Sequence, residues 1–158
     1  MKQTSIALKA FFSGFGLPAY PEGGVPTYEH DANGTRVEVK PPYITYQLIR
    51  TRWGQTAPFY ARVWYRSTNY DAINAVVDAI EEAIGEGTSI PTDRGAVYIY
   101  MGDPFCQYQD MAGDGTLKCA YLSMSLSCDT DYRTPPPAPP APDAGETDDA
   151  DETDNDTD

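Results

Sequence analysis

Side chains able to do acid-base or nucleophilic chemistry are sparse in this sequence. His30 is the single histidine, and we interpret it as an exposed loop residue rather than a catalytic base. Cys106 stands between Phe105 and Gln107 with no histidine nearby in the sequence to lower its thiol pKa, which favours a small buried residue over a nucleophile. No G-x-S-x-G, G-x-x-x-x-G-K-[ST] or G-x-G-x-x-G motif is present. We therefore expect a protein that is not an enzyme.

The candidate metal ligands are equally unpromising. Asp103, Asp110 and Asp114 surround the glycines of GDPFCQYQDMAGDG, but they lack the regular spacing and the terminal glutamate of a calcium loop, so we interpret them as turn-forming aspartates. The three cysteines include no C-x-x-C pair, which argues against a disulfide framework and a zinc site and favours a reduced, cytosolic protein. We expect neither a metal nor a cofactor.

Binding chemistry is better represented, because arginines alternate with aromatic residues in PPYITYQLIRTRWGQ (41–55) and FYARVWYRS (59–67). Tyr, Trp and Arg dominate the energetics of protein interfaces, and an aromatic-basic sheet face can also stack bases. A chain without a basic excess is poorly suited to phosphate binding, so we favour a protein interface and expect no sequence-specific nucleic acid binding. The alternative, in which a hairpin arm or helix of the same chain covers this face, stays open. The predicted interface residues are Arg50, Arg52, Trp53, Tyr60, Arg62, Trp64 and Arg66.

Charge is concentrated at the C-terminus. Residues 134–158 contain nine of the 24 acidic residues and none of the 11 basic ones, which leaves 15 acidic residues in 1–133. This terminal segment also has no aromatic, Val, Ile, Leu or Met residue, so it cannot bury enough apolar surface to offset the entropy of ordering. We predict a folded domain over 1–133 and a disordered tail over 134–158, Pro-rich at first and then acidic.

Two segments have the periodicity of amphipathic helices. Residues 4–15 place Leu8 and three phenylalanines at helical spacing, and residues 70–84 repeat Ile and Val at three- and four-residue intervals. We expect Ser67–Asn69 to provide the N-cap of the second helix and Gly85 to end it. No window approaches the roughly 20 apolar residues of a membrane span, and the N-terminus lacks a convincing signal-peptide cleavage site. We expect no membrane partner.

Strand patterns fill most of the remaining chain. Alternation predicts two strands before the second helix and two after it, with GDPFCQYQDMAGDG as a loop or a broken strand. Asn33-Gly34 predicts a tight primed turn of a hairpin. The order of elements predicts an α+β domain with two helices on one face of a mainly antiparallel sheet. The predicted strands are 43–52, 59–67, 96–102 and 116–128, and the hairpin lies within 27–40.

Four stretches resemble a family of small structural proteins from the head-tail modules of tailed bacteriophages and prophages of Gram-positive hosts, described as minor capsid or tail terminator (tail completion) proteins. They are AFFSGFGLPAYPEGGVP, PPYITYQL, FYARVWYRSTNYDAINAVVDAIEEAIGEG and GDPFCQYQDMAGDGTLKCAYLSMSLS. The resemblance covers roughly residues 7–128. Its most specific parts are the PYITY strand and the YARVWYRS segment.

The resemblance implies a fold similar to the lambda-type tail terminator. Such a virion protein forms a ring, commonly a hexamer, at the head-proximal end of the tail tube, where it ends tube polymerisation and joins the tail to the head. The implied partners are further copies of the chain, the tail tube protein and the head-closure or connector protein. The implied location is the tail or neck of the virion, after assembly in the host cytoplasm.

Two segments depart from the family pattern, and two alternatives remain open. The segment 27–40 looks like an inserted hairpin that could reach a neighbouring subunit, and the tail after residue 133 lies outside the resemblance. One alternative is a head-closure or neck connector protein of the same junction. The other is a small acidic regulator that binds a basic partner through its tail. Deleting residues 134–158 should leave a ring intact but abolish the activity of such a regulator.

Overall fold

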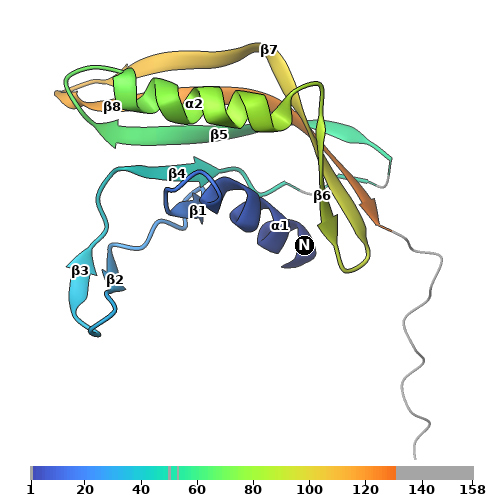
Figure 1. The fold of residues 1–158 in the computed structure, drawn as a ribbon, viewed down its shortest axis with the longest axis horizontal. Coiled ribbons are helices and arrows are strands. Elements are labelled where there is room, and N and C mark those ends of the chain that lie inside the picture. Colours follow the sequence, from blue (N-terminus) through green and yellow to red (C-terminus); the bar gives the residue numbers. More distant parts are fainter. Residues whose placement is uncertain (1, 50, 53, 131–158) are drawn as a thin grey trace, which may run out of the picture.

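The computed structural model describes residues 2–49, 51–52 and 54–130. In this part of the chain, the helices α1 (Lys2–Ser13) and α2 (Asp71–Ile84) accompany a curled sheet and a small separate hairpin (Figure 1). The sheet has six strands in the order β1-β4-β5-β8-β7-β6, and the separate hairpin pairs β2 with β3. The strands are β1 (Ala19–Pro21), β2 (Tyr28–His30), β3 (Arg36–Glu38), β4 (Tyr43–Tyr46), β5 (Thr56–Arg66), β6 (Thr88–Thr92), β7 (Gly95–Met111) and β8 (Asp114–Thr130).

The predicted α+β class is confirmed. Neighbouring strands of the six-stranded sheet are antiparallel, except that β1 and β4 run parallel. Both helices pack on one face of this sheet, and their apolar residues join a single core cluster. The predicted domain boundary at Arg133 and the predicted tail over 134–158 lie outside the described residues.

Helix α1 holds the two ends of the sheet together. It contacts β1 and β4 at one end of the strand order and β6 at the other, so the sheet curls around it (Figure 1). The Nε2 group of Gln3 also donates a hydrogen bond to Oδ2 of Asp93, in the turn after β6. The helix is thus the element that closes the concave side of the fold.

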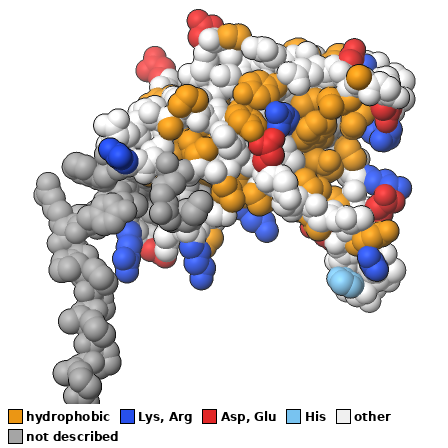
Figure 2. Space-filling model, turned by 180° about the vertical axis from the view of Figure 1, so that it is seen from behind, with side chains coloured by type: hydrophobic (Ala, Val, Ile, Leu, Met, Phe, Trp, Pro, Cys, Tyr) orange, Lys and Arg blue, Asp and Glu red, His pale blue; other side chains and the backbone are white. Residues whose placement is uncertain are grey.

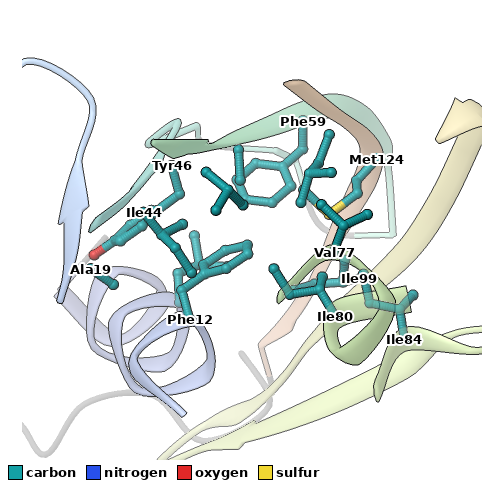
Figure 3. Packing of buried hydrophobic residues seen from close by; sticks show 14 of the residues in the cluster. Phe12, Ala19, Ile44, Tyr46, Phe59, Val77, Ile80, Ile84, Ile99 and Met124 are labelled. Carbon is teal, nitrogen blue, oxygen red and sulfur yellow. The ribbon is translucent and has the colours of Figure 1, made fainter. Parts of the chain in front are cut away.

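The core contains aromatic side chains under α1 and aliphatic side chains under α2 (Figure 3). Phe12 is fully buried and stacks on Tyr46, with ring centroids 5.4 Å apart, while Phe59 lies at 6.1 Å. Each large apolar side chain buried in this way stabilises the fold by about 1.5–3 kcal/mol. α2 contributes the buried residues Ile73, Val76, Val77, Ile80 and Ile84.

Helix α2 ends as predicted but begins differently. Gly85 has a φ of 52°, and its N–H donates to the carbonyl of Glu81 at 2.8 Å, which satisfies one of the last carbonyls of the helix. The N-cap position is Tyr70, which makes no side-chain cap hydrogen bond. Asn69, one of the predicted caps, contacts the first helical residue: its Oδ1 accepts a hydrogen bond from the N–H of Asp71 at 3.4 Å, and its Nδ2 donates to the carboxylate of Asp71 at 2.7 Å.

The strand predicted over 43–52 is shorter in the structure. β4 ends at Tyr46, and the N–H of Gln47 makes one more hydrogen bond to β5. Beyond this point no strand ladder fixes which way successive side chains point. Leu48, which strict alternation places on the core side, is 41 % exposed, whereas Ile49, which alternation places on the other side, packs against the core.

The predicted strands 96–102 and 116–128 belong to a longer hairpin, in which β7 and β8 have 17 residues each. The stretch between them is a broken strand, because the register of β7 shifts between Met101 and Cys106 and again between Asp110 and Met111. β6, which pairs with β7, was not predicted.

Gly102 permits the first register shift, because a Cβ atom at this position would lie 2.8 Å from the carbonyl oxygen of Ser123. We expect Gly102→Ala to lower the free energy of unfolding by about 1–3 kcal/mol, since backbone must move to relieve the overlap. Gly115→Ala in β8 is the matched control, because a Cβ there meets nothing within 4 Å. Urea denaturation of the two variants checks this, and equal midpoints would contradict it.

The hairpin of β2 and β3 projects from the body of the domain (Figure 1), and we call residues 27–40 the arm. All six strand residues of the arm are exposed. Its turn differs from the prediction: the N–H of Gly34 donates to the carbonyl of Asp31, and Gly34 rather than Asn33 has a positive φ, 78°. This is a type I turn followed by a left-handed glycine, in place of the primed turn predicted from Asn33-Gly34.

Candidate protein-protein interface

The convex face of the sheet, opposite the helices, carries several of the residues that the sequence singled out. Tyr60, Arg62 and Trp64 alternate along β5 with buried core residues, as predicted. The antiparallel register places Arg62 opposite Tyr121 of β8. Glu22, which follows β1, reaches the same face and contacts Arg62. We call Glu22, Tyr60, Arg62, Trp64 and Tyr121 the outer-face cluster.

An aromatic and arginine stack forms the centre of this cluster. The rings of Tyr60 and Tyr121 are stacked with centroids 5.3 Å apart. The guanidinium carbon of Arg62 lies 4.9 Å from the Tyr60 ring centroid and 5.5 Å from that of Tyr121. Because the positive charge faces the electron-rich rings, each of these contacts is favourable. The three side chains are half-buried, so part of each remains available to a partner.

Glu22 accepts hydrogen bonds from two polar groups of the stack. Its carboxylate accepts one hydrogen bond from the Arg62 guanidinium and another from the Tyr60 hydroxyl. The hydrogen bond to Glu22 raises the pKa of Tyr60, because it keeps the phenol in its protonated, donating form. The side chains of Arg62 and Glu22 are 27 % and 37 % exposed, so this ion pair is partly screened by solvent.

Trp64 is anchored from the neighbouring strand. Its Nε1 group donates to Oγ1 of Thr45 at 2.9 Å, and its ring lies 6.5 Å from that of Tyr43. Tyr43 in turn packs edge-on against Tyr20, with centroids 5.9 Å apart. The aromatic surface therefore extends from β5 across β4 to β1. Figure 2, from the side opposite to Figure 1, shows hydrophobic side chains gathered around an adjoining basic and acidic side chain.

The other predicted interface residues do not join this cluster. Arg66 lies at the end of β5, where its guanidinium pairs with Asp114 at 2.7 Å. Arg52 is exposed in the segment between β4 and β5. Arg50 and Trp53 lie outside the described residues. The structure thus brings together three of the seven predicted side chains: Tyr60, Arg62 and Trp64.

Two members of the cluster were missed by the sequence prediction. Tyr121 could have been found, since alternation along 116–128 places it on the face opposite Leu122. Glu22 gave no signal, because it lies in a Pro-Gly turn segment and only the parallel pairing of β1 with β4 brings it over β5. Other parts of the same chain contact this face: Glu22 contacts Arg62, and Glu29 of the arm contacts Tyr20.

Two of the three aspartates weighed as metal ligands, Asp110 and Asp114, have separate partners. Asp110 accepts hydrogen bonds from the ammonium group of the buried Lys118 at 2.7 Å and from the hydroxyl of Tyr70 at 2.6 Å. The bond from Lys118 and then that from Tyr70 lower the pKa of Asp110, and the same contact raises the pKa of Tyr70 to about 12. Over the described part of the chain, no three His, Cys, Asp or Glu side chains gather as a metal site would require.

The carboxylate of Asp114 contributes to the stability of the fold in a way that depends on pH. Hydrogen bonds from Thr116 and the guanidinium of Arg66 lower its pKa from 3.8 to about 2. A carboxylate with a depressed folded-state pKa stabilises the fold above the unfolded pKa, and this stabilisation is lost as the pH falls through the folded value. We therefore expect the melting temperature of Asp114→Asn to lie below that of the wild type above pH 4 and to converge with it towards pH 2. A difference that stays constant over pH 2–6 would contradict this.

The cluster suits protein binding, because the Glu22 carboxylate is already paired with Arg62 and Tyr60, and partly exposed aromatic rings lie beside this ion pair. Comparison with protein-family models finds no family that matches this chain, and comparison with curated proteins finds no significant relative. Neither described helix is long and apolar enough to cross a bilayer.

Proposed function

We propose that this protein is a structural subunit of a tailed-bacteriophage virion, with a lambda-type tail-terminator fold. It forms a ring, with six copies as the expected number, at the head-proximal end of the tail tube. There it ends tube polymerisation and joins the tail to the head. It acts by association rather than catalysis, and its partners are further copies of the chain, the tail tube protein and the head-closure or connector protein.

The projecting arm is the observation that carries this proposal. An isolated two-stranded hairpin is at best marginally stable in water, and further strands or a packing surface are needed to stabilise it. The base of the arm is fixed to the domain, because the hydroxyl of Tyr20 donates to Glu29 at 2.9 Å. Its strands are nevertheless exposed on both faces. A neighbouring subunit would supply the packing surface that the arm lacks.

The outer-face cluster supports the same function. Its aromatic rings and Arg62 are of the types that contribute most at protein interfaces. They are held in place by internal contacts, so little side-chain entropy is lost when a partner binds. The resemblance over residues 7–128 includes β5, from which three members of the cluster project. An arm and a separate sheet face also provide two different contact surfaces, as a closed ring of head-to-tail contacts requires.

The test is the solution mass of the full chain by light scattering over a range of protein and salt concentrations, with negative-stain images of the same sample. We expect a mass that is an integral multiple of the subunit and closed rings in the images. The ring should also bind the end of purified tail tubes. A chain that stays monomeric at every concentration and does not bind tubes would contradict the proposal.

A further inference from the structure

A groove of about 220 Å³ opens between the start of α1 and the segment that follows β4. Its lining residues are Lys2, Thr4 and Ser5 on the helix side and Leu48 and Ile49 on the other. Leu48 is 41 % exposed although it is a large apolar side chain. The volume exceeds that of an engineered apolar cavity of about 150 Å³ that binds benzene, so the groove has room for a ring-sized side chain.

Strand β8 ends beside this groove. Cys128 Sγ lies 3.9 Å from Oγ1 of Thr4, which is one of the lining residues. The end of β8 and the N-terminal end of α1 also lie on the same side of the molecule in Figure 1. Three residues can span roughly 10 Å at about 3.3–3.6 Å each. The segment that begins at residue 134 is therefore within reach of the groove.

The composition of that segment matches the groove. Residues 135–142 are exclusively Pro and Ala, and such a run loses little entropy on binding because it favours the polyproline II conformation beforehand. Nine acidic residues lie within 134–158. Lys2 lines the groove, α1 contains no acidic residue, and the N-terminal end of a helix carries partial positive charge.

We propose that residues 135–142 occupy the groove between α1 and the segment after β4 of the same chain, with the acidic residues that follow near Lys2. The sequence alone predicts disorder for this run because it has too little apolar surface of its own. The groove supplies that surface from Leu48 and Ile49. The interaction is independent of ring formation and of the proposed phage function.

Backbone ¹⁵N relaxation of the full chain tests the proposal at Ala138 and Ala141, which have amide protons. Rigid amides have order parameters near 0.85 and flexible ones fall below about 0.6. We expect values above about 0.6 in the wild type and below it in Leu48→Asp, since a carboxylate in the groove repels the tail and removes apolar contact. Lys2→Glu should lower the values part of the way. Lys9→Glu, on the same helix but outside the groove, should leave them unchanged.

Three results would overturn the proposal. The alanine amides could be flexible in the wild type, or they could be ordered to the same extent in Leu48→Asp. Their order could also decrease on dilution, which would show that the occupant comes from a second copy. Thermal unfolding of Leu48→Asp serves as the control for folding, and Leu48→Ala provides a milder variant that shortens the apolar wall without adding charge.

Discussion

Phe12→Ala should destabilise the domain severely, by about 3–5 kcal/mol of unfolding free energy. Phe12 is fully buried, stacks on Tyr46 and lies close to Phe59. Its removal leaves a cavity between α1 and strands β4 and β5, in a region where the surrounding side chains are themselves fully buried and have little freedom to collapse into the space. Since a domain of this size is typically stable by about 5–15 kcal/mol, the variant should lose a large fraction of its stability.

Urea denaturation followed by circular dichroism measures this effect. The control is Ile6→Ala on the same helix, because Ile6 is 55 % exposed and its truncation should change the unfolding free energy by no more than about 0.5 kcal/mol. If Phe12→Ala were no more destabilising than Ile6→Ala, α1 would not be the element that closes the fold. A normal midpoint with a reduced slope would instead indicate a change in the denatured state.

The sequence predicts those parts of the fold in which apolar residues follow one regular period. The helix predicted over 70–84 matches α2 to within a residue, because its buried side chains recur at three- and four-residue spacing along its whole length. The alternation along β5 is equally regular, and Phe59, Ala61 and Val63 are all buried as expected. In such segments the side chains that the local periodicity places on the apolar face are the ones that the tertiary structure buries.

Prediction fails where the tertiary environment overrides the local pattern. Alternation alone continues β4 to residue 52, but the chain leaves the sheet after Gln47. β6 was missed because Thr88–Thr92 is a polar edge strand that contains Pro91. A proline is tolerated in an edge strand, where its missing N–H faces away from the ladder. Such a segment forms a strand because it pairs with a neighbouring strand, in this fold β7, and its own sequence gives little indication of this.

The candidate interface shows the same division between local and long-range information. Tyr60, Arg62 and Trp64 share a face because they alternate within one strand, which sequence periodicity reveals. Glu22 joins them from 40 positions away along the chain, and only the parallel pairing of β1 with β4 brings it there. Ion pairs between distant segments have no periodic signature, so the internal partner of Arg62 could not be predicted.

Reversing the charges of Arg62 and Glu22 should distinguish a contribution of this ion pair to the stability of the chain from a contribution to the proposed assembly. Arg62→Glu alone would place two carboxylates together and remove the cation from the Tyr60–Tyr121 stack. Because the pair is partly exposed, we expect a loss of only about 1 kcal/mol in stability. Residues at the centre of an interface contribute about 2 kcal/mol or more, so the proposed ring assembly through this cluster should weaken roughly 30-fold or more.

The double variant Glu22→Arg/Arg62→Glu decides between the two roles, because it restores opposite charges within the chain but presents them to a partner in exchanged positions. We expect its unfolding free energy to return close to that of the wild type while assembly, measured by light scattering, stays at least roughly 30-fold weaker. Lys9→Glu changes the net charge as much as Arg62→Glu does, on the exposed side of α1, and should affect neither quantity. If assembly recovered together with stability in the double variant, the ion pair would act only within the chain. The contact between subunits of the proposed ring would then have to lie elsewhere, and the arm would be the next surface to test.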